Sequence, residues 1–145
     1  MAKFVYKFES IKKVKEALEK KAQKEVALIE MEIDKQRSEY NRIADKESSS
    51  RRNGIKKEVS VAEIKFKKNY EQYLSRQKAA VMEKIIQLEK NKKTKLEELV
   101  QKSKEHKIFD SLEENYHDNF NKEQSQQELK FIDELATQKF IRQAK

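Results

Sequence analysis

The chain has very few places at which its backbone can turn sharply. Among its 145 residues there is no proline and a single glycine, Gly54. Glycine and proline mark most turns of a compact fold, so their scarcity indicates a small number of long elements. Charged residues make up 41% of the chain. With Ala, Glu, Lys, Leu and Arg dominant, this composition is typical of coiled coils and long helices. The sequence therefore predicts an all-α protein.

Apolar residues in the first third of the chain recur at helical spacing. Over residues 4–43 they are separated mostly by three or four positions, which places them on one face of a helix. Residues 48–54, Ser-Ser-Ser-Arg-Arg-Asn-Gly, then favour a turn. Serine side chains compete for backbone hydrogen bonds, and Asn-Gly readily adopts positive φ. The pattern predicts a helix over about 4–47 and a turn over about 48–58.

The second helix has a clear start. Residues 60–63, Ser-Val-Ala-Glu, match a capping box, in which the serine and glutamate side chains each accept a hydrogen bond from the other's backbone amide. Apolar residues then recur from 64 to 136 without a glycine or proline, which predicts a helix over about 60–142. We expect the two helices to pair as an antiparallel coiled-coil hairpin in a single domain, residues 1–145.

The two predicted helices differ in length. At 1.5 Å per residue the first is roughly 66 Å long and the second roughly 125 Å. Either residues 60–75 form a separate short helix at the apex of the hairpin, or the long helix runs on unpaired. The less regular apolar pattern over 66–73 favours a break near Ser75. A closed hairpin would place residues 131–136 beside Phe4 and Phe8.

Residues that usually carry catalysis or bind metals are sparse. Without cysteine there are no thiolate ligands, and one glycine is too few for a phosphate-binding loop. His106 and His117 are three helical turns apart, too far to share a metal, and Glu113 with His117 would supply only two ligands. We expect these histidines to be exposed or at the edge of the seam. The sequence predicts no enzyme activity, no metal and no cofactor.

The charge is unevenly distributed. Residues 1–104 carry 28 Lys and Arg against 17 Asp and Glu, a net +11, whereas residues 105–145 carry six against nine, a net −3. Acids are interleaved with the bases, as in Lys-Lys-Val-Lys-Glu at 12–16, which disfavours nucleic-acid binding. The uneven charge indicates either electrostatic steering toward partners or simply a solvated surface that keeps the protein in solution. No apolar run is long enough for a membrane span, so we expect a soluble intracellular protein.

Two apolar clusters are candidates for protein contacts. The first is a tyrosine-rich patch that comprises Phe66, Tyr70, Tyr73 and Leu74. Aromatic side chains bury large rigid areas at interfaces, although these could instead pack into the apex of the hairpin. The second cluster is residues 131–136, which would either close the seam at the open end or contact a partner there.

Three segments carry a resemblance to a known family. Residues 4–16 form an aromatic start to a charged helix. A middle segment follows Gly54 and comprises residues 60–63 and residues 69–74, Asn-Tyr-Glu-Gln-Tyr-Leu. Ile-Asp-Glu-Leu-Ala-Thr at 132–137 lies near the end. In this order they resemble the FliJ family of flagellar export proteins, which is related to the stalk proteins of type III secretion.

The resemblance implies an antiparallel coiled coil similar to the central stalk of rotary ATPases. One end would enter the ring of the export ATPase FliI and stimulate ATP hydrolysis. Another part would contact the export gate protein FlhA, and the chain would handle export chaperones. The protein would be cytoplasmic and peripherally associated with the export apparatus of the inner membrane.

The resemblance also implies two contact sites. The ATPase would meet the paired termini, through Ile11, Lys15, Leu18, Ile132 and Leu135. The export gate would meet a set that follows the tyrosine-rich patch, namely Tyr70, Tyr73, Gln77, Ala80 and Lys84. The family can place apolar or histidine residues where this chain has Gln77 and Lys84, so these two positions depart from its pattern.

Two alternatives stay open at this level. One is a generic cytoplasmic coiled-coil scaffold, for which a long parallel dimer would be evidence. The other is a basic helical binder of nucleic acid or anionic membrane, which would show a steep loss of affinity with salt.

Overall fold

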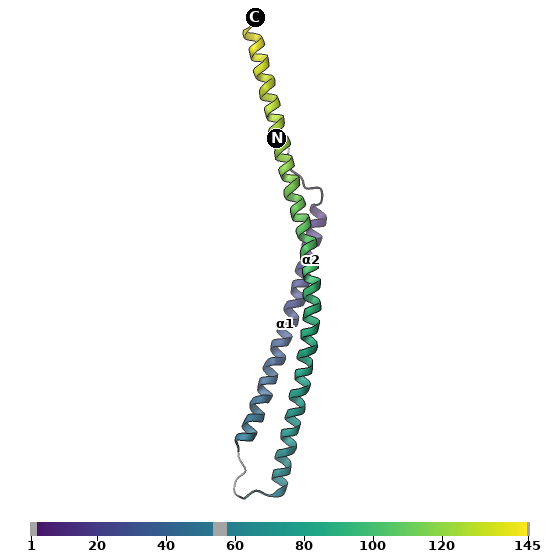
Figure 1. The fold of residues 1–145 in the computed structure, drawn as a ribbon, viewed down its shortest axis with the longest axis vertical. Helices are drawn as coiled ribbons and strands as arrows, with labels where there is room; N and C mark the ends of the chain where they lie inside the picture. The colour runs from purple at the N-terminus through teal and green to yellow at the C-terminus, as the bar shows by residue number, and fades with distance from the viewer. Residues whose placement is uncertain (1–2, 54–57, 145) are drawn as a thin grey trace. The chain divides into compact units, whose positions relative to one another are not determined.

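The computed structural model describes residues 3–53 and 58–144. Helix α1 spans Glu9–Arg52 and helix α2 spans Val61–Gln143, and no strand is present in these two ranges (Figure 1). The two helices pack against each other in opposite directions. The prediction of an all-α antiparallel hairpin is therefore confirmed.

Helix α1 begins and ends later than the spacing of apolar residues indicates. It begins at Glu9 because residues 4–8 are not helical, and the Glu9 amide donates to the Tyr6 carbonyl oxygen at 3.3 Å. It continues through the three serines to Arg52. Arg51 and Arg52 lie in its last turn, where cations interact favourably with the helix dipole. Gly54, which the predicted turn includes, lies outside the described residues.

Helix α2 begins at the predicted capping box. The Glu63 amide donates to Ser60 Oγ at 3.2 Å, and the Ser60 amide donates to Glu63 Oε2 at 3.1 Å. From Val61 the helix continues to Gln143 without the break that was considered near Ser75. Next to that position Leu74 is buried against α1, so the packing holds this part of α2 in a single helix.

Residue contacts divide the chain into two compact units. The central unit is Lys20–Val100, and the terminal unit joins the residues up to Glu19 with those from Gln101 onward. Each unit contains a part of α1 and a part of α2, and each is described on its own below. The assignment of the whole chain to one domain stays a prediction.

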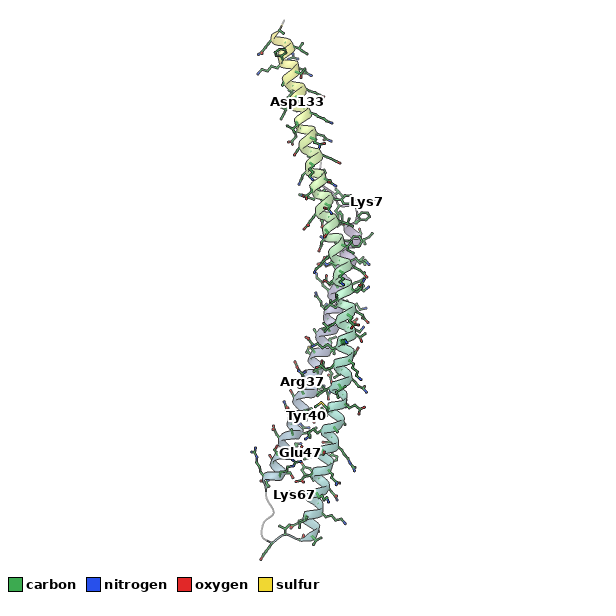
Figure 2. The ribbon with its side chains drawn as sticks, viewed as in Figure 1. Lys7, Arg37, Tyr40, Glu47, Lys67 and Asp133 are labelled. Carbon is green, nitrogen blue, oxygen red and sulfur yellow. The ribbon has the colours of Figure 1, made fainter. Side chains whose placement is uncertain are left out.

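The central unit has a narrow apolar seam with charged side chains along it. Ile43, Leu74, Val81 and Ile85 form a buried cluster, and Tyr40 packs against it. Residues on α1 pair in reverse order with residues on α2: Glu25–Lys95 at 3.1 Å, Glu30–Lys92 at 3.0 Å, Arg37–Glu89 at 2.9 Å, and Glu47–Lys78. Arg37, Tyr40 and Glu47 follow one another along α1 (Figure 2). Ion pairs thus accompany the apolar residues along the seam.

The terminal unit joins the N-terminal residues to the second half of α2. Lys12 bonds to Asp110 at 2.9 Å and to Glu113, and Lys15 bonds to Glu105 at 2.8 Å. Phe4 contacts the rings of His117 and Phe120, with centroids 5.2 and 5.6 Å away.

Helix α2 continues beyond this pairing. From residue 125 to the end of α2 every residue is exposed, and Figure 1 shows this part as a single helix. We call residues 125–143 the C-terminal segment. The expectation that residues 131–136 lie beside Phe4 and Phe8 is wrong, because Phe4 already meets α2 at Phe120. The unequal lengths of the two helices leave this segment without a partner in the described structure.

Neither helix, within the residues that the structure describes, has a stretch both long and apolar enough to cross a membrane.

Candidate interaction surfaces

The residues expected to meet the export gate lie on one exposed face of α2. Tyr70, Tyr73, Gln77, Ala80 and Lys84 are separated by alternating steps of three and four, so they line a single stripe of the helix. All five are exposed. The stripe is stabilised from within by the Gln77 side-chain amide, which donates to the Tyr73 hydroxyl at 2.6 Å. We call these five residues the tyrosine surface.

The tyrosine-rich patch divides between the seam and solvent. Leu74 is 2% exposed and belongs to the buried cluster, whereas Phe66 is 73%, Tyr70 39% and Tyr73 55% exposed. The alternative in which these aromatic residues pack into the apex is therefore wrong for all three rings. Leu74 and Val81 occupy the seam, and the three rings lie outside this buried cluster.

A groove adjoins the tyrosine surface in the central unit. It has a volume of about 640 Å³, and Phe66 and Tyr70 line its α2 side. The α1 side is polar, with Arg42 and Asp45 among its lining residues. Lys67 Nζ, between the two aromatic positions, donates to the Asn53 carbonyl oxygen at 3.0 Å. The groove thus has one aromatic and one charged wall, and a hydrogen bond joins the two sides.

The residues expected to meet the ATPase are not brought together. Ile11, Lys15 and Leu18 lie on α1 where it pairs with α2. Ile11 is 44% and Leu18 37% exposed, and Lys15 is bonded to Glu105. Ile132 and Leu135 lie in the C-terminal segment and are 58% and 49% exposed. Because α2 is a continuous helix, Ile132 is 19 residues and roughly 28 Å beyond Glu113, the last residue bonded to Lys12.

The N-terminal residues pack in an arrangement that helical spacing did not predict. In residues 4–8, Phe-Val-Tyr-Lys-Phe, the aromatic residues alternate with exposed ones, and Tyr6 is only 5% exposed. The Tyr6 hydroxyl donates to the Phe109 carbonyl oxygen at 3.0 Å, and the rings of Tyr6 and Phe8 both contact Tyr116. This alternation, which departs from helical spacing, is the signal that could have revealed a non-helical segment before Glu9.

Several titratable side chains of the terminal unit have shifted pKa values. Burial raises the pKa of the Tyr6 phenol above its usual value, and the charge of Glu113 adds to the effect. Hydrogen bonds to Glu113 and Asp110 raise the pKa of Lys12. The hydrogen bond from Lys15 lowers the pKa of Glu105. These ion pairs therefore hold the two helices together in their charged forms at neutral pH.

Neither histidine is placed for metal binding. His106 lies at the edge of the seam, with Nδ1 2.6 Å from a carboxylate oxygen of Glu19, and His117 is exposed beside Asn121. Both positions agree with the sequence prediction. Across residues 3–53 and 58–144, no group of three or more His, Asp or Glu side chains could hold a metal ion.

The geometry defines a class of protein. Two antiparallel helices with a thin, charged seam and exposed aromatic and apolar stripes form a coiled-coil interaction protein. The family model described as flagellar FliJ protein matches residues 4–145, so the chain belongs to the FliJ family. The family is a non-catalytic component of the flagellar export apparatus, a type III secretion system. Searches of curated proteins and of solved structures found no match.

Proposed function

We propose that this protein is the coiled-coil stalk of the export apparatus. It binds the ring of the export ATPase FliI, promotes ATP hydrolysis without hydrolysing ATP itself, and couples the ring to the export gate protein FlhA and to export chaperones. It acts in the cytoplasm, held at the inner-membrane apparatus through its protein partners. The observation that carries this proposal is that each unit has exposed aromatic or aliphatic side chains, which are formed by different residues of the two helices.

The tyrosine surface is the proposed contact for the export gate. Tyr70 and Tyr73 offer large, rigid and partly exposed rings, which are frequent anchors of protein interfaces. The aromatic wall of the adjoining groove, at Phe66 and Tyr70, would receive a side chain of the partner. Gln77 and Lys84 make the rest of this surface polar, so we expect binding to the gate to weaken as salt concentration rises.

The proposed ATPase contact is in two parts. Ile11, Lys15 and Leu18 belong to the paired part of the terminal unit, whereas Ile132 and Leu135 belong to the single C-terminal segment. The ring would therefore meet both a helix pair and a lone helix. Charged residues surround both parts, and such interfaces favour reversible contacts.

An ATPase assay tests the proposal. The rate of the purified flagellar export ATPase is measured with the intact chain, with Ile11→Ala/Leu18→Ala and with Ile132→Ala/Leu135→Ala. We expect stimulation by the intact chain and, for each double variant, a concentration for half-maximal stimulation raised about tenfold, as truncating two interface anchors implies.

The matched control is Tyr73→Ala, which should stimulate as the intact chain does, and circular dichroism should show all variants helical. Hydrolysis by the chain alone, or the absence of any effect on the ATPase, would overturn the proposal.

The alternative of nucleic-acid or membrane binding has less support. Many lysines along the seam are paired with acids, including Lys12, Lys15, Lys92 and Lys95. A lysine that neutralises a carboxylate is less available to a phosphate. A log–log salt dependence of RNA affinity with a slope of several units would revive this alternative.

A further inference from the structure

The C-terminal segment is an unpartnered helix with many apolar side chains. Leu129 and Phe131 are each 60% exposed, Ile132 is 58% and Leu135 is 49% exposed. Asp133, labelled in Figure 2, lies in the middle of the segment. A helix of this length is only marginally stable in water without packing along one face. These side chains therefore form a surface that would gain stability from a partner.

One face of the segment has a symmetric pattern of charge. Glu128, Ile132, Leu135 and Lys139 are separated by steps of four, three and four, so they form a single stripe on α2. An acid lies four residues before the apolar pair and a base lies four residues after it. No ion pair of Glu128 or Lys139 is present among the residues that the structure describes, and both side chains are exposed. We call these four residues the C-terminal stripe.

We propose that the C-terminal stripe binds a second copy of this chain in an antiparallel homodimer. With the twofold axis between residues 133 and 134, Ile132 of each copy lies opposite Leu135 of the other. The same axis sets Glu128 of each copy opposite Lys139 of the other, which forms two ion pairs.

The charges select the direction of pairing. In a parallel dimer in register, Glu128 would face Glu128 and Lys139 would face Lys139, and such like-charge contacts are unfavourable. Only the antiparallel arrangement pairs each acid with a base. The pattern is thus complementary to itself.

The overall charge of the segment also favours a second copy. Residues 125–143 contain three acidic side chains and three basic ones, so the segment has no net attraction to a strongly acidic or basic partner. The paired stripe is short, and interfaces of this size are weak and transient. We therefore expect a dimer that forms in the micromolar range and dissociates on dilution. It is a property of the isolated chain and does not rest on the proposed ATPase contact, although it would cover Ile132 and Leu135.

Sedimentation equilibrium of the full chain at several concentrations tests the dimer. We expect Glu128→Lys and Lys139→Glu each to weaken dimerisation about tenfold or more, because each places like charges opposite one another twice. The double variant Glu128→Lys/Lys139→Glu restores both ion pairs and should dimerise as the intact chain does.

The matched controls are Glu134→Lys and Lys130→Glu, which make the same changes of net charge on the opposite face of α2. They should leave dimerisation unchanged. A chain that stays monomeric at every concentration would refute the proposal. It would equally be refuted by a dimer that survives both single charge reversals, or by a double variant that is no better than the single ones. Circular dichroism of each variant confirms that the helix content is retained.

Discussion

At the scale of single residues, charged and aromatic side chains help to hold the two helices together. In proteins with a larger core, aliphatic residues make most of these contacts. The described part of the chain buries few apolar residues, among them Ile33, Ile43 and Leu74 at 2–3% exposure. Farther along the seam from Leu74, Lys92 and Lys95 bond to glutamates of α1. Glu47, only 8% exposed, is a charged member of the seam itself. Single substitutions at such positions should therefore have measurable effects on the fold.

Glu47 should make the stability of the central unit depend on pH. The hydrogen bond from Lys78 lowers the pKa of Glu47 below its usual value of 4.5, and the charge of Arg51 acts in the same direction. A carboxylate with a lowered pKa stabilises the folded state above its unfolded pKa, and this contribution is lost as the pH falls through the folded pKa. We expect Glu47→Gln to unfold at a lower temperature than the intact chain near neutral pH. The difference should close below about pH 4.5.

Thermal unfolding followed by circular dichroism, repeated from neutral to acidic pH, measures this effect. The exposed Asp45→Asn on the same helix is the control and should unfold with the intact chain throughout. If the difference in melting temperature between Glu47→Gln and the intact chain stays constant at acidic pH, the Glu47 carboxylate does not stabilise the central unit as proposed.

Tyr6 should stabilise the terminal unit through its hydroxyl group. Tyr6→Phe keeps the ring contacts but removes the hydrogen bond to the Phe109 carbonyl oxygen. The part-buried carbonyl oxygen is then left without this donor, which is unfavourable. We expect the melting temperature to fall by about 2–5 °C. The neighbouring Val5 is 77% exposed, so Val5→Ala should melt with the intact chain. Equal melting temperatures for Tyr6→Phe and the intact chain would show that the bond contributes nothing.

At the scale of helices, α1 and α2 differ in how much of each is packed. Helix α1 contacts α2 along much of its length, whereas α2 is paired only up to about Phe120. Beyond Phe120, the backbone hydrogen bonds of α2 are shielded from water only by the side chains of α2 itself. The two helices should therefore differ in local stability.

Leu74 should be the most sensitive single position of the central seam. It is 2% exposed and lies in the cluster with Ile43 and Val81. We expect Leu74→Ala to lower the free energy of unfolding by about 2–3 kcal/mol, since the substitution leaves a cavity in a seam that has little else. Met82, on the outer side of α2, is 39% exposed, so Met82→Ala should cost less than about 1 kcal/mol. Urea unfolding measures the free energy of unfolding of both variants. Similar decreases for Leu74→Ala and Met82→Ala would contradict the buried position of Leu74 in the seam.

Hydrogen exchange should separate the paired and single parts of α2. Amides near Leu74 and Val81 lie in the buried seam, while those of the C-terminal segment lie in an exposed helix without a partner. Local opening needs less free energy where few contacts are broken. We expect exchange in residues 125–143 to be faster by about two orders of magnitude or more. Dilute protein should be used, because the proposed dimer would slow exchange in this segment. If the amides of the C-terminal segment in dilute protein were protected as well as those near Leu74 and Val81, the segment would not be an unpaired helix.

At the scale of the whole molecule, the two proposed contacts use different residues and should be separable. The tyrosine surface lies in the central unit and Ile132 with Leu135 in the terminal unit. We expect Tyr73→Ala to weaken binding to the purified cytoplasmic part of the gate protein about tenfold while ATPase stimulation is kept. Ile132→Ala/Leu135→Ala should show the reverse. Calorimetry and the ATPase assay give the two readouts, and loss of both functions in either variant would contradict separate sites.

The sequence by itself determined the elements and the family of this protein. Helical periodicity and the Ser60–Glu63 capping box are local properties, because helical hydrogen bonds join residues four apart, and both were predicted correctly. The stripe that contains Tyr70 and Tyr73 could also be predicted, since it depends only on spacing. The single glycine similarly limited the chain to two long helices.

Only the tertiary structure decided which residues meet. The bond between Tyr6 and Phe109 joins residues 103 positions apart, and nothing in the local pattern sets the register between α1 and α2. Helical spacing therefore suggested a helix from Phe4, whereas residues 4–8 are not helical and Tyr6 contacts Phe109 and Tyr116. A closed hairpin would also have placed residues 131–136 beside Phe4, whereas the longer helix α2 continues past Phe4. Side chains such as Ile132 are exposed because α2 extends beyond the end of α1. How far it extends depends on the register between the two helices and not on the sequence around Ile132.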